Sequence, residues 1–206
     1  ANNASNQVTY PADNGLAQQL KNVALLIAGG LQTKVYIVSI GGFDTHGAQV
    51  NDGDTANGQH AALLQALSNA VALFQQDLAL LGVEKRVLTM TFSEFGRRIN
   101  SNDSLGTDHG DAAPLLLFGS CVEPGFFGDS PEIPANPEVG DAVAMQYDFR
   151  NIYGSLFMDW FDVAEADVKN LLFADFQKTP LVSTSCLTTD SYSVAPPALE
   201  VETYPN

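Results

Sequence analysis

Two short motifs in this 206-residue chain combine an aspartate with a histidine. Asp44 lies two residues before His46 at the end of an apolar stretch, Glu94 follows a second apolar stretch, and Asp108-His109 comes after a further polar loop. Carboxylate and imidazole groups together suit Zn²⁺, Mn²⁺ or Fe, and carboxylates alone suit Mg²⁺ or Ca²⁺. We therefore predict a divalent-metal site formed by Asp44, His46, Glu94, Asp108 and His109. The alternative is that these side chains are hydrogen-bonded or solvated without a metal.

Other reactive side chains near these motifs are few. Arg97 and Arg98 are an adjacent basic pair, and Arg97 is the predicted catalytic residue because a guanidinium can hold a phosphate, sulfate or carboxylate group by two hydrogen bonds. An ion pair with a neighbouring carboxylate is its competing role. His60 begins a predicted helix, where capping or packing is expected. Ser93 lacks the G-x-S-x-G context of a nucleophile elbow.

The elements that must position these motifs are indicated by the apolar pattern. Helices are predicted over residues 16–27, 60–81 and 148–161, and strands over 34–40, 86–92 and 114–119. This alternation predicts an α/β fold with a mainly parallel sheet and helical crossovers. In such sheets ligands bind beyond the carboxyl ends of the strands, which is where the polar motifs lie.

Composition argues against several kinds of partner. The chain has 24 acidic and 9 basic residues and a net charge of −15, so it has no electrostatic attraction to nucleic acids or anionic membranes. It contains no run of about 18 apolar residues, so no membrane insertion is expected. Its first residues lack the features of a signal peptide, so either the mature protein begins here or upstream sequence is absent.

The chain divides into two regions by composition. Residues 1–178 are predicted to form the α/β domain, and residues 179–206, rich in Ser, Thr and Pro, an extended tail. The two cysteines, Cys121 and Cys186, lack zinc-site spacing. From the residues alone, a disulfide and two unrelated buried thiols are equally acceptable.

Five segments of the chain resemble a known family. The sequences GGFDTHGAQ (41–49), QHAALLQAL (59–67), TFSEFGRR (91–98), GTDHGDAAP (106–114) and DFRNIYGSL (148–156) resemble the domain of unknown function 1501. The resemblance covers roughly residues 16–162. The members of that family are bacterial, usually exported proteins that are often labelled arylsulfatase-like. The family is grouped with the alkaline-phosphatase superfamily.

This resemblance implies an alkaline-phosphatase-like fold that binds metal and hydrolyses phosphate or sulfate esters. Asp44 and His46 resemble the family's first ligand pair, and His109 its last ligand. The segment at 93–96 stands where the superfamily has S-D-H-G, so Glu94 can replace the aspartate, but Phe95 cannot replace the histidine. That departure puts a second metal in doubt. Alternatively, Asp108-His109 itself takes the place of the Asp-His pair.

The resemblance also implies that this chain holds only part of the fold. In the superfamily a first ligand and a Ser or Thr nucleophile lie upstream, so we expect a missing N-terminal half, or another chain, to complete the sheet. The last residues, LEVETYPN, resemble the start of a sorting domain of the type IX secretion system of Bacteroidetes. The protein is therefore expected to be secreted or on the cell surface, a location that fits a Cys121–Cys186 disulfide.

Two functions follow from these expectations. One is part of an exported metal-dependent hydrolase-like protein acting on phosphate or sulfate esters. The other is a non-catalytic secreted or cell-surface protein that keeps the fold and serves in binding or surface assembly. The sequence leaves open whether the chain is an enzyme.

Overall fold

The computed structural model describes residues 4–172, 175–183 and 186. Its elements in chain order are α1 (Gly15–Ala28), α2 (Gln59–Leu80), a 3-10 turn η1 (Glu84–Arg86), β1 (Thr89–Met90), β2 (Gly96–Ser101), β3 (Thr107–Gly110), β4 (Leu117–Phe118), α3 (Phe149–Asp159) and α4 (Glu165–Leu172). The predicted sorting segment at 199–206 and most of the predicted tail lie outside the described residues. None of the described helices is both long enough and apolar enough to span a membrane.

The helices lie where the apolar periodicity predicted three of them. The side chain of Asn14 caps α1 by accepting the N–H of Ala17, and Gly30, with φ of +87°, follows its end. α2 ends before Gly82, which also has a positive φ of +69°. α4 was not predicted, because its eight residues include only a few apolar side chains.

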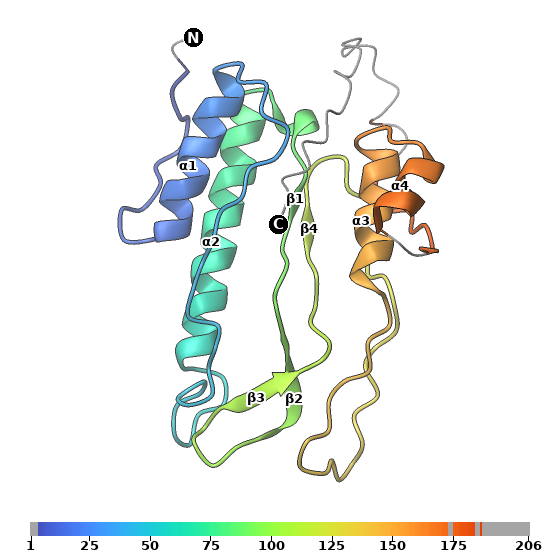
Figure 1. Ribbon diagram of the computed structural model, residues 1–206. Helices are drawn as coiled ribbons and strands as arrows, with labels where there is room; N and C mark the ends of the chain where they lie inside the picture. The colour runs from blue at the N-terminus through green and yellow to red at the C-terminus, as the bar shows by residue number, and fades with distance from the viewer. Residues whose placement is uncertain (1–3, 173–174, 184–185, 187–206) are drawn as a thin grey trace, which may run out of the picture.

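The two long helices pack together as one layer. α1 and α2 lie side by side (Figure 1), and their apolar faces share a core that includes Leu20, Phe74 and Leu78. Asp77 is fully buried on α2, where it accepts hydrogen bonds from the backbone N–H of Gln7 at 2.7 Å and the hydroxyl of Tyr10 at 3.1 Å. These bonds attach the N-terminal segment to the helix pair.

The prediction of an α/β fold with a mainly parallel sheet is wrong. The described residues form two small antiparallel sheets, β1 with β4 and β2 with β3. The connection from β1 to β4 contains the β2–β3 hairpin instead of a crossover helix, so the chain returns antiparallel. In Figure 1, β1 and β4 lie between the α1–α2 pair and the α3–α4 pair, and the hairpin lies at one end of the molecule.

Residues 34–40 explain most of this error. They are extended, and alternate residues are exposed as in a strand, but they pair with no strand among the described residues. The side chain of Gln19 instead accepts the N–H of Ser39 at 3.0 Å and donates to its carbonyl at 2.8 Å. Tyr36, Val38 and Ile40 pack against the core of the helix pair. This apolar segment, which is rich in β-branched residues, therefore packs on the α1–α2 layer as an extended strip without a strand partner.

A second core lies under α3. It joins Ile152 and Leu156 of α3 to Leu181, Val182 and a disulfide between Cys121 and Cys186, whose Cα atoms are 5.5 Å apart. The alternative of two separate thiols is thus excluded. The long segment from residue 119 to 148 contains no helix and none of the strands β1–β4.

Candidate metal centre

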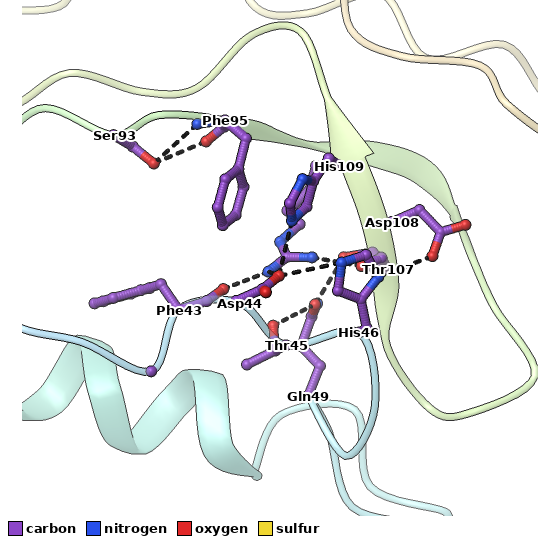
Figure 2. A network of polar contacts seen from close by, with 12 residues as sticks. Phe43, Asp44, Thr45, His46, Gln49, Ser93, Phe95, Thr107, Asp108 and His109 are labelled. Atoms are coloured by element: carbon purple, nitrogen blue, oxygen red, sulfur yellow. Dashed lines mark hydrogen bonds and ion pairs between the residues drawn. The ribbon is translucent and has the colours of Figure 1, made fainter.

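The loop that follows residues 34–40 delivers Asp44 and His46. Thr45 between them is 1% exposed, and its hydroxyl donates to the side-chain oxygen of Gln49 at 2.9 Å. The hydroxyl of Thr107 on β3 donates to the same oxygen at 2.7 Å. Because Thr45 is anchored inward, its two neighbours point outward toward the hairpin (Figure 2).

The β2–β3 hairpin brings His109 to this loop. Arg97 of β2 pairs with His109 of β3 in the antiparallel register. The tip of the hairpin lies directly on the loop, since a Cβ atom on Gly106 would be 2.3 Å from the carbonyl carbon of His46. Only glycine permits so close a backbone approach, so Gly106 helps to fix the distance between the two halves of the site.

Three side chains converge on one point. The Nε2 atom of His109 lies 2.7 Å from Oδ1 of Asp44, and Nε2 of His46 lies 3.1 Å from the same oxygen. One ligand atom from each of the three residues lies within 4.8 Å of the others. Their side chains are 45–61% exposed, so the cluster is open to solvent.

This cluster fits a transition metal. Four ligands about 2.0–2.1 Å from a tetrahedral Zn²⁺ lie about 3.3 Å from one another. The distances of 2.7 and 3.1 Å between the Asp44 oxygen and the two histidine nitrogens are close to this value. Two imidazole nitrogens facing one carboxylate oxygen require protons or a cation between them. Mg²⁺ and Ca²⁺ prefer sites made of oxygen ligands, so two histidines favour Zn²⁺, Mn²⁺ or Fe.

Electrostatics keep Asp44 ionised. Its hydrogen bond with His109 lowers the pKa of the Asp44 carboxyl below its ordinary value, and the nearby His46, His109 and Arg97 lower it further. An ionised carboxylate is the form that binds a metal.

Asp108 is close to the cluster but lies behind it. Its Oδ1 atom is 3.1 Å from Nδ1 of His46, on the far side of the ring from Asp44. Asn102 donates to the same oxygen at 3.2 Å. The Asn102 bond and then the His46 bond lower the pKa of Asp108. The structure therefore places Asp108 as a partner of His46, and Asn102 is a site residue that the sequence analysis missed.

Phe95 holds the ring of His109. The two rings stack with their centroids 3.7 Å apart and their planes 8° from parallel. Phe95 stands where the resemblance leads one to expect a ligand histidine, and it supplies a flat apolar surface instead. Glu94, its neighbour, is exposed and is not a member of the three-residue cluster.

Arg97 connects the two parts of the chain that form the site. Its two terminal nitrogens donate to the carbonyls of Phe43 and Thr107, one on each side of the cluster. The guanidinium is 3.7 Å from Oδ1 of Asp44, and the side chain is 18% exposed. Arg98 on the other face of β2 is exposed and donates through Nε to the carbonyl of His109 at 3.1 Å.

His60 lies outside the cluster. Its ring packs edge-on against Phe43, with centroids 5.7 Å apart and planes at 88°. The position in the first turn of α2 and this contact agree with the packing role expected from the sequence.

Among known proteins, this chain is similar to a family. No curated protein and no solved structure matches the chain. One family model, described as a protein of unknown function (DUF1501), matches residues 3–157, which include every residue of the cluster. Its description states no activity. The chain belongs to the DUF1501 family.

Proposed function

We propose that this chain is part of an exported, metal-dependent hydrolase-like protein that acts on phosphate or sulfate esters. One observation carries the proposal: Asp44, His46 and His109 present ligand atoms within 4.8 Å of one another from two separate parts of the chain. Three protein ligands and an open fourth position are typical of catalytic metal sites. The half-exposed cluster has that open side.

The residues around the cluster have separable tasks in this proposal. Asp44, His46 and His109 would hold the metal, which when bound would polarise the ester and stabilise the leaving oxygen. Arg97 holds the Asp44 loop against β3 and places a positive charge 3.7 Å from the Asp44 carboxylate. That charge reduces the repulsion between an anionic ester and the strongly acidic chain. Both terminal nitrogens of Arg97 already donate to backbone carbonyls, so its role in this proposal is to support the site and not to bind the substrate.

Export is supported by the disulfide. Disulfides such as Cys121–Cys186 form and persist in oxidising compartments and are rare in reducing ones. We accordingly propose a secreted or cell-surface location.

Completion by another segment is supported by residues 34–40. Val35 is 63% exposed and Ile37 is 78% exposed on a strand-like strip that has no strand partner among the described residues. We propose that a missing N-terminal half, or another chain, covers this strip and brings the nucleophile.

Elemental analysis of the purified protein tests the metal. We expect near-stoichiometric zinc, manganese or iron in the wild type, and its loss in the Asp44→Ala/His109→Ala variant. Asp111→Ala is the matched control, because it removes an exposed carboxylate that is outside the cluster. A screen with nitrophenyl phosphate and nitrophenyl sulfate, made on the protein together with its completing segment, then asks for turnover that follows metal content. A folded wild type without metal would refute the metallohydrolase proposal.

A non-catalytic binding or assembly role is the second candidate. It is favoured by the segment between β4 and α3, where Phe126 is 103% exposed and Val139 is 96% exposed. The same segment also exposes Phe127 and Ile133, and exposed apolar side chains that gather in a patch mark interaction surfaces. Bound metal without turnover even when the completing segment is present, together with a native mass above that of one chain, would support this second role over catalysis.

A further inference from the structure

Asp108 has an unusual place for a residue of a metal-binding motif. Its carboxylate lies behind His46, at 3.1 Å from Nδ1, while Nε2 of the same ring lies 3.1 Å from Asp44 (Figure 2). His46 therefore stands between two carboxylates, with only one of them in the candidate ligand set.

The Asp108 oxygen is held in this place by Asn102. The side-chain oxygen of Asn102 accepts the backbone N–H groups of Ser104 at 3.0 Å and Gly106 at 3.1 Å. The amide nitrogen must then face the other way, where it donates to the carbonyl of His46 at 2.8 Å and to Asp108 at 3.2 Å. The turn of the hairpin thus orients Asn102, and Asn102 orients Asp108.

This arrangement determines which nitrogen of His46 is left for a metal. An ionised carboxylate can only accept, so Nδ1 must donate to Asp108. Without a metal, Nε2 faces the Asp44 carboxylate as well and needs a proton there. With a metal between Nε2 and Asp44, the neutral ring keeps its proton on Nδ1 and offers the lone pair of Nε2 to the metal. Partners of this kind fix both the tautomer and the orientation of a histidine that binds metal.

We propose that Asp108 is a positioning residue that, held by Asn102, presents Nε2 of His46 to a metal and does not bind the metal itself. The inference rests on the metal site of the proposed function. It changes the role of Asp108, which the sequence predicted to be a ligand. Loss of such a partner typically lowers metal affinity by about 10- to 100-fold.

Two measurements on the full chain test this role. Zinc titration gives the affinity, and long-range proton–nitrogen NMR of the zinc-loaded protein at about pH 8 reports the His46 tautomer. We expect Asp108→Ala to weaken zinc binding about 10- to 100-fold and to shift His46 away from the Nδ1-protonated form. Asp108→Asn should lose less, because an amide oxygen still accepts from Nδ1. Asp111→Ala, the matched loss of one exposed carboxylate, should change neither reading.

The outcomes separate this inference from the metal proposal. Unchanged zinc affinity or an unchanged tautomer in a folded Asp108→Ala variant would overturn the positioning role, as would an equal loss of affinity in Asp111→Ala. If Asp108→Ala does not fold, Asp108→Asn decides by the same two readings. A wild type that binds no zinc would refute the metal site and the positioning role with it. A wild type that binds zinc, with unchanged readings in Asp108→Ala, would refute the positioning role alone.

Discussion

At the scale of single residues, Phe95 shows how a departure from a family pattern is resolved. The resemblance placed a metal ligand at this position, and phenylalanine cannot bind a metal. Its ring stacks on His109 with the centroids 3.7 Å apart, so it orients a candidate ligand instead of being one. Arg97 also lies over the Phe95 ring, 4.9 Å from its centroid.

Phe95→Ala should weaken zinc binding while leaving the fold intact. Stacked aromatic pairs contribute about 0.5–1.5 kcal/mol, so freeing the His109 ring should reduce affinity about two- to tenfold. Phe92→Ala, which truncates a nearby phenylalanine that is 68% exposed, is the control and should have no effect. Calorimetric zinc titration measures both. Equal affinities for Phe95→Ala and the wild type would show that the stack does not orient the ligand.

At the scale of elements, α3 depends on its N-terminal cap. Asp148 accepts the backbone N–H of Arg150 at 2.9 Å and pairs with the Arg150 guanidinium. The guanidinium bond, followed by the backbone bond, lowers the pKa of Asp148 from 3.8 to about 2. The ionised form therefore stabilises the folded state above pH 3.8, and this contribution is lost as the pH falls through about 2.

Asp148→Ala should lower the free energy of unfolding by about 1 kcal/mol at neutral pH, the usual value of an N-cap. The difference from the wild type should shrink as the pH falls from 3.8 toward 2, because protonation removes the ionised cap. Asp148→Asn keeps an accepting oxygen and should recover most of the stability without this pH dependence. Urea unfolding across the pH range measures all three proteins. A difference that stays constant with pH would contradict the assigned cause.

At the scale of the whole molecule, the protein has two separate cores, and the residues of the site belong to neither. The loop of Asp44 and His46 extends from the α1–α2 layer, whereas the second core packs β1 and β4 side chains with α3 and the disulfide. Cys121 and Cys186 are 65 residues apart in the chain, and their bond closes a long loop around the second core. Such a bond limits the freedom of the unfolded chain and contributes about 2–4 kcal/mol.

A Cys121→Ser/Cys186→Ser variant should lose about 2–4 kcal/mol of unfolding free energy. Its zinc affinity should match the wild type under conditions where both are folded, because none of the three candidate ligands belongs to the second core. Denaturant unfolding and zinc titration of the same samples check both expectations. A parallel loss of zinc affinity would mean that the two cores are coupled through the site.

The sequence by itself determined the long helices and the polar loops between them. Helical hydrogen bonds join residues four apart, so the apolar stripes of α1, α2 and α3 were visible within short windows. The Asp-His motifs were likewise recognised as a candidate metal site, and the site and its chemistry remain predictions.

Only the tertiary structure decided strand pairing and the division of tasks within the site. Residues 34–40 have a strand-like composition, but pairing depends on a distant partner, and none exists among the described residues. Asp44 and His109 are 65 residues apart, and Asp108 and His46 are 62 apart. Which carboxylate faces which ring nitrogen depends on how the hairpin lies on the loop, and no local pattern in the chain carries that information.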